Sequence, residues 1–306
     1  SAALVSRSGS IDWLCLPNFS SPSLFAAILD PERGGRFAIT PVQPFDVSRR
    51  YAGNSAVIET EYRTASGVIR VTDAMIIGDS PCQLEPLREV IRVVQGLEGT
   101  VPVQIIFDPR PDYGRSRPRL EARGRSRICR WGSEALILRT DHEPATGEAD
   151  EGRIDVEAGR RINFSLSYNR RDIAVLPPLA ERVAGRIVPT GARWNLWCGG
   201  LAYDARYRDS VLRSALTLKL MTFTLSGAVV AAPTTSLPEW IGAGRNWDYR
   251  YCWLRDAALT MRSLIGLGYL DEARAFFNWM LHATRLTWPE LQVLYDVYGR
   301  TEIAEQ

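Results

Sequence analysis

Two patterns of apolar and polar positions divide this chain. Up to about residue 188, β-branched and aromatic residues alternate with polar ones in short runs bounded by Gly, Pro and Asp, which is typical of antiparallel strands. After about residue 203, apolar residues recur every three or four positions, as in helices that bury one face. The pattern predicts an antiparallel β-sandwich over residues 1–188, a linker over 189–202 and helices over 203–306.

The strand predictions rest on local runs and on the turn signals between them. Ala56–Thr64 and Val68–Ile77 flank Ala65-Ser66-Gly67, so they form a predicted hairpin. Leu87–Val94 and Thr100–Phe107 are predicted as a second pair around a turn that contains two glycines. Further expected elements are strands at Arg36–Thr40, Glu134–Thr140 and Arg161–Tyr168 and a surface turn at Asp141–Gly152.

The helical region is expected to begin after a stretch rich in helix breakers. Pro177-Pro178 and Pro189–Gly191 mark the change from one pattern to the other. The predicted helices run from about Val211 to near Gly227, from Arg255 or Asp256 to Gly266 or Gly268, and over Asp271–His282.

Composition narrows the possible partners and locations. Apolar residues make up 45% and charged residues 24% of the 306 positions, which is ordinary for a globular protein. No apolar run is as long as the roughly 18 residues of a membrane helix, and Ser1–Leu4 shows no signal peptide, so a cytoplasmic location without a membrane partner is expected. The net charge of +2 gives no reason to expect a nucleic-acid partner. The oligomeric state stays open.

Arginine is concentrated in one segment of the chain. Eight arginines lie between Arg110 and Arg130, while Lys219 is the only lysine in the sequence. A site for a polyanion is one interpretation of the segment. A solvated hairpin or loop is favoured, because Asp112 and Glu121 lie among the arginines and no row of aromatic residues accompanies them.

Cysteine and histidine give no sign of metal or nucleophilic chemistry. The five cysteines are widely spaced without a C-x-x-C motif, and the only histidines are His142 and His282. Neither a disulfide framework nor a zinc site is expected, and no cofactor is predicted. Because no histidine lies near Cys252 in the sequence, we interpret it as a small packed thiol.

The segment Arg245–Ala257, with the sequence RNWDYRYCWLRDA, combines aromatic and charged residues at unusual density. Indole and phenol rings stack against the C–H faces of a sugar, and arginine and carboxylate groups form directed hydrogen bonds with its hydroxyls. Such a mixture therefore favours a carbohydrate-binding site.

The same segment resembles the bacterial branch of the glucoamylase-like glycoside hydrolases of family 15, which includes glucoamylases, glucodextranases and trehalases. Ala232–Glu239, with the sequence APTTSLPE, precedes it as in that family. Other stretches that resemble the family are Leu4–Asp30, Ser214–Pro233 and Leu291–Gly299. The resemblance therefore runs along nearly the whole chain.

The resemblance implies an N-terminal β-sandwich, a linker and an (α/α)6 barrel that carries the active site. Only about three barrel helices fit before Gln306, so the chain is expected to be the front part of a longer enzyme with an incomplete barrel. Family members hydrolyse glycosides with inversion, using an acid and a base carboxyl group about 6.5–9.5 Å apart. In the family both glutamates lie in later barrel segments, so no catalytic acid or base is assigned here. Glu239, Glu290 and Glu302 match no catalytic motif of the family.

The substrate-binding residues implied by the resemblance lie in the aromatic segment. Arg255 and Asp256 are expected to bind hydroxyls of the terminal glucose, with a helix N-cap as an alternative role for Asp256. Tyr249 is expected beside the reacting sugar ring, and Trp253 is expected to support the acid. Asp248 is expected to orient Arg250 or Arg255, or else to form a surface ion pair. Four other tryptophans, Trp240, Trp247, Trp279 and Trp288, are interpreted as packing residues.

The sequence thus predicts an α-glucoside hydrolase that releases terminal glucose. Trehalose and malto- or isomalto-oligosaccharides are the candidate substrates, and trehalose is slightly favoured. The alternative is a non-catalytic carbohydrate-binding or regulatory protein that has half of an active site. A third interpretation is a phosphorylase with the same arrangement of domains.

Overall fold

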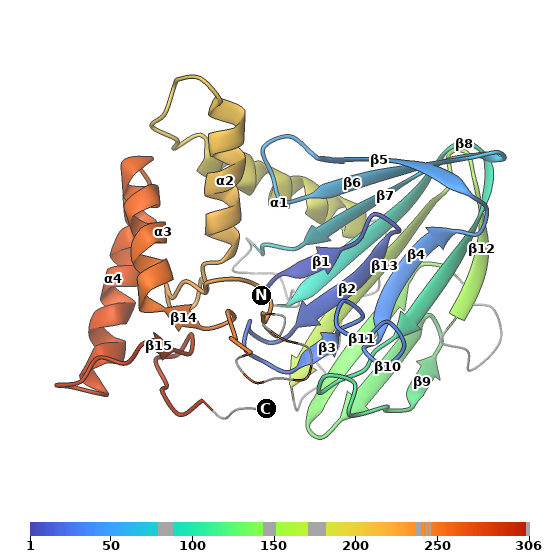
Figure 1. The fold of residues 1–306 in the computed structure, drawn as a ribbon. Helices are drawn as coiled ribbons and strands as arrows, with labels where there is room; N and C mark the ends of the chain where they lie inside the picture. Colours follow the sequence, from blue (N-terminus) through green and yellow to red (C-terminus); the bar gives the residue numbers. More distant parts are fainter. Residues whose placement is uncertain are drawn as a thin grey trace. The chain divides into compact units, whose positions relative to one another are not determined.

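A computed structural model describes residues 1–78, 88–142, 151–170, 182–236, 240, 242, 244 and 246–303. The chain forms two compact units, whose elements are labelled in Figure 1. The β unit comprises Ala3–Leu16 and Pro22–Asn195, and the helical unit comprises Ser1–Ala2, Pro17–Ser21 and Leu196–Gln306. The division falls inside a helix, and a short N-terminal segment belongs to the helical unit.

The β unit is built from antiparallel strands that form two sheets sharing one long strand. The first sheet contains β1–β4, the second half of β8, and β12, and the second sheet runs β5-β6-β7-β8-β13-β11-β10-β9. The strands are β1 (Ala3–Val5), β2 (Ser10–Cys15), β3 (Ser23–Phe25), β4 (Arg36–Pro41), β5 (Phe45–Tyr51), β6 (Ile58–Thr64), β7 (Gly67–Met75), β8 (Glu89–Asp108), β9 (Leu120–Arg123), β10 (Ser126–Trp131), β11 (Glu134–Thr140), β12 (Glu151–Glu157) and β13 (Arg161–Arg170). The predicted sandwich is confirmed.

Two local predictions within the β unit are also confirmed. The β6–β7 hairpin pairs Thr64 with Gly67, which leaves only two residues in its turn. The second half of the arginine-rich segment forms the β9–β10 hairpin, in which Glu121 accepts a 2.6 Å hydrogen bond from Arg130, and its first half forms a turn and loop. Of the predicted turn at Asp141–Gly152, residues 143–150 lie outside the described residues, as do Leu87 and Pro177-Pro178.

The pair of strands predicted on either side of residues 95–99 is wrong, because β8 is one continuous strand. Its first half pairs with β7 and β13, and its second half pairs with β4 and β12, so β8 passes from one sheet to the other. Strands that change sheets make the corners of a sandwich. Gly96 serves close packing there rather than a reversal, because a Cβ atom at this position would lie 2.0 Å from the Glu157 carbonyl oxygen.

A buried ion pair joins the two sheets inside the core. Arg92 on β8 is fully buried, and its Nε donates a 2.7 Å hydrogen bond to Oδ1 of Asp73 on β7. The other two nitrogens of the guanidinium donate to the carbonyl oxygens of Phe37 on β4 at 2.7 Å and of Gly9, just before β2, at 2.6 Å. Arg92 is therefore a buried cation with partners in both sheets, and its guanidinium lies over the ring of Phe37, 4.8 Å from the centroid.

Helix α1 (Arg182–Cys198) occupies most of the segment that was predicted to be a linker. Pro189 and Gly191 lie inside this helix, although both residues disfavour helix interiors. Val183 and Ile187 lie on one helical face and pack against Ile91 and neighbouring residues of the second sheet. Burial of this apolar face outweighs the local preference for a break, so Pro189 and Gly191 do not interrupt the helix, and the boundary between the two units, at residues 195–196, falls inside the predicted linker 189–202.

The helical unit contains the three helices that the apolar periodicity predicted. They are α2 (Arg208–Leu220), α3 (Leu254–Gly266) and α4 (Leu270–Arg285), accompanied by β14 (Cys252–Trp253) and β15 (Leu294–Tyr295). Helix α3 packs between α2 and α4 (Figure 1). Helix α2 ends seven residues before Gly227, because the chain folds back in a turn with Thr222 bridged to Val229.

A buried carboxylate ties three elements of the helical unit together. Glu272 at the start of α4 accepts hydrogen bonds from Lys219 of α2 at 2.8 Å and from the Trp197 indole at 2.6 Å. The Trp197 ring stacks on Tyr269 with centroids 4.0 Å apart. Burial raises the pKa of the Glu272 carboxyl, but the hydrogen bonds from Lys219 and Trp197 outweigh burial and hold the pKa below its ordinary value of 4.5.

This lowered pKa predicts how the helical unit responds to acid. A carboxyl group with a depressed pKa stabilises the fold above its unfolded-state pKa, and this contribution is lost as the pH falls through the folded-state pKa. We expect the melting temperature of the helical unit to decrease once the pH is lowered below about 4.5. Glu272→Gln should remove part of this dependence of the melting temperature on pH. Thermal scans from pH 7 to pH 3 measure it. Glu290→Gln, at an exposed position, is the control, and an equal effect of both variants would contradict the prediction.

Candidate functional site

The aromatic segment lies beside a strand-like segment, with Thr235 bridged to Asp248, and it turns at Tyr249 and Arg250. The backbone carbonyl oxygen of Tyr249 accepts a 2.8 Å hydrogen bond from the amide of Ala232. The carbonyl oxygen of Trp247 accepts one of 2.7 Å from the amide of Ser236. The chain then enters β14, which pairs Cys252 with Tyr295 of β15. Helix α3 begins directly after β14, so the segment changes from extended to helical structure between Trp253 and Leu254.

Three aromatic rings of this segment gather around one another. The ring of Trp253 lies 6.2 Å from that of Tyr249 and 6.0 Å from that of Trp247, the latter in an edge-to-face arrangement. The Trp253 indole N–H donates a 2.8 Å hydrogen bond to the carbonyl oxygen of Asp248. Tyr249 and Trp253 are half-buried, so part of each side chain stays accessible. This arrangement suits stacking against a sugar ring.

The two charged residues expected to bind hydroxyls lie in the first turn of α3. The N-cap position is Trp253, so the alternative that Asp256 caps the helix is wrong. Asp256 instead lies within the first turn, where the helix dipole stabilises a negative charge. Its Oδ2 lies 3.1 Å from Nη2 of Arg255, and the two side chains are 32% and 75% exposed. Both groups are therefore accessible to a ligand.

Asp248 pairs with Arg250 and not with Arg255 in this structure. Its carboxylate accepts hydrogen bonds from Nε of Arg250 at 2.9 Å and from Nη2 at 2.7 Å, and its Oδ1 also accepts the Arg250 amide at 2.9 Å. Arg250 is 3% exposed, and its Nη1 donates to the carbonyl oxygen of Ser21 at 2.9 Å. The expectation that Asp248 orients Arg255 is therefore wrong.

Sequence reasoning gave Arg250 no role beyond that of a possible partner of Asp248. A signal was present, because the side chain of an Asp in a turn often accepts the backbone amide two residues on, as Asp248 accepts that of Arg250. That spacing favours an interaction of Asp248 with Arg250 over one with Arg255. The contact with Ser21 had no sequence signal, because the acceptor is a backbone carbonyl group 229 positions away.

The remaining candidate groups are a cysteine, the tryptophans that were expected to pack, and the glutamates. Burial raises the pKa of the Cys252 thiol to about 12, so it stays protonated at neutral pH and is the packed thiol that was expected. Trp279 is buried as expected, whereas Trp247, Trp240 and Trp288 are 42%, 75% and 79% exposed, so among the described residues the predicted packing role fits only Trp279. Glu290 and Glu302 are exposed, and Glu239 lies outside the described residues.

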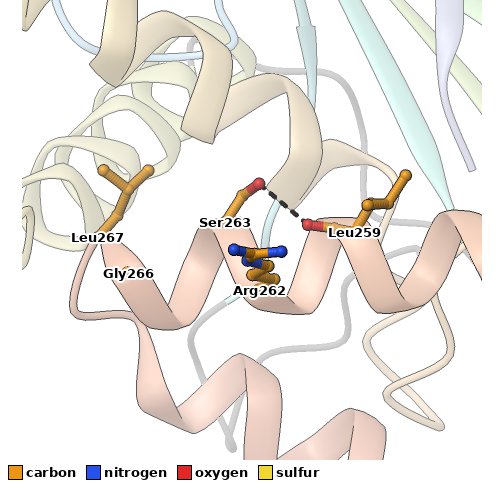
Figure 2. Close-up of a pocket in the computed structure, with 5 residues that line it drawn as sticks. All are labelled: Leu259, Arg262, Ser263, Gly266 and Leu267. Atoms are coloured by element: carbon orange, nitrogen blue, oxygen red, sulfur yellow. Dashed lines mark hydrogen bonds between the residues drawn. The ribbon is translucent and has the colours of Figure 1, made fainter.

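The surface of α3 also carries a shallow hollow away from these residues. It is lined by Leu259, Arg262, Ser263, Gly266 and Leu267, and the hydroxyl of Ser263 is turned back onto the carbonyl oxygen of Leu259 at 2.9 Å (Figure 2). None of the predicted sugar-binding residues lines it. The part of the chain that the structure describes holds no cluster of three or more His, Cys, Asp or Glu residues suited to a metal ion. Among these same residues, no helix is both long and apolar enough to cross a membrane.

Comparison with known proteins agrees with the sequence motifs. Residues 205–304 match the model of the glycosyl hydrolases family 15, and residues 1–141 match that of a trehalase-like N-terminal domain. A trehalase of Thermoplasma acidophilum is 34% identical over 99% of this chain and 52% of its own length. Trehalases of Thermoplasma volcanium and Mycolicibacterium smegmatis are 33% and 32% identical over 100% and 99% of this chain, and over 49% of each relative. The chain thus spans about half the length of these relatives.

Proposed function

Because this chain belongs to family 15 of the glycosyl hydrolases, we propose that it is part of an enzyme that hydrolyses an α-glucoside, with trehalose as the substrate. The observation that carries the proposal is local. Two half-buried rings, Tyr249 and Trp253, directly precede two accessible charged groups, Arg255 and Asp256, at the start of α3. The names of the relatives favour trehalose over malto- and isomalto-oligosaccharides. The cytoplasm as location and the independence from a cofactor stay predictions.

In the proposed site, each residue of this chain binds or orients one glucose unit. Arg255 donates hydrogen bonds from its guanidinium to hydroxyl oxygens, and Asp256 accepts hydrogen bonds from hydroxyl groups. Tyr249 and Trp253 contact the apolar faces of the ring. Cleavage with inversion additionally requires one carboxyl group that protonates the leaving oxygen and one that activates water. We assign neither role to a residue of this chain.

The helical unit offers apolar surface on which the remainder of a barrel would pack. Leu259 and Ile265 of α3 are 61% and 50% exposed, and Phe277 and Leu281 of α4 are 54% and 46% exposed. Exposed apolar patches of a few hundred square ångströms or more are uncommon on monomeric proteins. Together with the share of the relatives that the chain spans, this supports the proposal that further helices complete the active site.

Glucose release from trehalose, maltose and isomaltose tests the proposal. We expect no turnover by the 306-residue chain and release of glucose from trehalose by the product of the complete gene. Turnover by the chain alone would show that an acid and a base lie within it, against our assignment. A requirement for inorganic phosphate would instead identify a phosphorylase.

The alternative function is a non-catalytic protein that binds a sugar at the same residues. It is consistent with the presence of a half site made only of binding groups. The two functions differ in one result, which is turnover by the complete gene product. Sugar binding that persists without hydrolysis of any of the three α-glucosides would favour the binding protein.

A further inference from the structure

A turn near the start of the chain forms part of the helical unit, far in sequence from the aromatic segment. Pro17–Ser21 groups with residues after Leu196 and not with the strands on either side of it. The side-chain oxygen of Asn18 accepts hydrogen bonds from the hydroxyls of Ser20 at 3.2 Å and Ser21 at 3.0 Å, and the ring of Phe19 is 1% exposed. The turn is therefore ordered and anchored.

Arg250 connects this turn to the candidate sugar site. Its guanidinium donates to the Ser21 carbonyl oxygen at one end and to both carboxylate oxygens of Asp248 at the other. Asp248 in turn accepts the indole N–H of Trp253 on its backbone carbonyl oxygen at 2.8 Å. An unbroken chain of hydrogen bonds thus runs from the turn, through Arg250 and Asp248, to the ring of Trp253.

Burial makes this connection rigid. Arg250 is 3% exposed, so water competes little for the hydrogen bonds of its guanidinium. Charge-assisted hydrogen bonds in such surroundings are stronger than those on the surface. A planar guanidinium also fixes the angle between its partners, which a lysine ammonium group does not do. The pair Arg274–Asp271 also contains a guanidinium, but its side chains are 74% and 91% exposed, so it lacks this burial.

We propose that Arg250 is a positioning residue, which sets the orientation of the Trp253 ring by holding Asp248 against the turn Pro17–Ser21. The N-terminal turn is then part of the frame of the sugar site. The identity of the ligand rests on the proposed function, whereas the orientation of Trp253 does not. If Arg250 only stabilised the fold, its loss would lower the unfolding temperature and leave the environment of Trp253 in folded molecules unchanged.

The first measurement follows the Trp253 indole N–H in the chain without ligand. Its nitrogen–proton NMR signal is assigned with Trp253→Phe, and its hydrogen exchange is compared with that of the other indoles. In Arg250→Met and in Asn18→Ala, we expect exchange of this proton to become about tenfold faster. Arg250→Met removes the charge-assisted hydrogen bonds to Asp248, and Asn18→Ala removes the acceptor that closes the turn. Arg274→Met is the control and should change nothing. An unchanged Trp253 signal in folded Arg250→Met and Asn18→Ala would overturn the proposal.

Two further variants make the result specific. Asn18→Ala leaves Arg250 and Asp248 intact, so it tests the connection even where Arg250→Met does not fold, and Arg250→Lys should fail to restore the signal despite its charge. In the Arg250→Met background, Asn18→Ala should have no additional effect on Trp253, because the connection is already broken. Additive effects would indicate two independent contributions to stability and would contradict the proposal.

A trehalose titration of the same proteins separates this inference from the proposed function. If the wild-type chain binds trehalose, both variants should weaken binding about tenfold without a matching effect of Arg274→Met. If the product of the complete gene neither binds nor hydrolyses trehalose, the proposed function fails. The indole measurement still decides whether Arg250 positions Trp253.

Discussion

Asp256→Asn is expected to weaken the binding of glucose or trehalose to this chain about tenfold to a hundredfold, the cost of one or two hydrogen bonds to a charged acceptor. In the proposed site the carboxylate would accept hydrogen bonds from two hydroxyl groups, whereas the asparagine side chain presents a donor in place of one acceptor. Asp256 also loses the favourable interaction of its charge with the N-terminus of α3. Arg255→Ala should have an effect of similar size, because it removes the fork beside Asp256.

Asp271→Asn supplies the matched control for this prediction. Asp271 lies in the first turn of α4, as Asp256 does in α3, and its side chain is 91% exposed. Both substitutions therefore remove a charge from a helix N-terminus, but only Asp256 belongs to the aromatic segment Arg245–Ala257. Isothermal titration with glucose and with trehalose measures the affinities. Equal affinities of wild type and Asp256→Asn would remove this residue from the proposed site.

Arg92→Met is expected to lower the free energy of unfolding of the β unit by about 3–5 kcal/mol, as is typical when one partner of a buried ion pair is removed. Asp73 is 5% exposed and would keep a charge without its cation. The carbonyl oxygens of Gly9 and Phe37 would also lose their donors, and these are the bonds that join the two sheets. The loss should therefore exceed that of a single surface ion pair, which is worth about 0–1 kcal/mol.

Urea unfolding followed by circular dichroism measures the effect of Arg92→Met. Two transitions are expected, because the chain has two compact units, and only the transition of the β unit should move. Arg274→Met removes an arginine from an exposed pair and should shift neither transition by more than about 0.5 kcal/mol. A loss below about 1 kcal/mol in Arg92→Met would mean that the pair contributes no more than a surface contact.

Several elements followed from the sequence because their determinants are local. The β6–β7 hairpin was predicted from the turn at Ala65-Ser66-Gly67, and helix α3 begins and ends within two residues of its predicted bounds. Helix α4 extends three residues past the predicted end at His282, where periodicity alone is weak. The candidate site was found for a similar reason, since Tyr249, Trp253, Arg255 and Asp256 lie within eight positions of one another.

The failures share one physical cause, which is competition between local preference and tertiary packing. Gly96 was interpreted as a turn residue, but in the structure it lets the backbone of Glu157 approach β8. Pro189 was interpreted as a break, but the apolar face of α1 packs on a sheet and keeps the helix continuous. In both cases, residues distant in sequence decided the conformation of a residue whose own preference pointed elsewhere.

By itself, the sequence determined the order of a β-sandwich and helices, the family and the segment that supplies the candidate sugar-binding groups. Periodicity and short motifs carry this information because they depend on neighbours within a few residues. Only the tertiary structure decided that β8 belongs to both sheets, that Arg250 pairs with Asp248, and that the turn Pro17–Ser21 supports the aromatic segment. These features depend on backbone carbonyl groups and on contacts across long sequence separations, which residue identity does not encode.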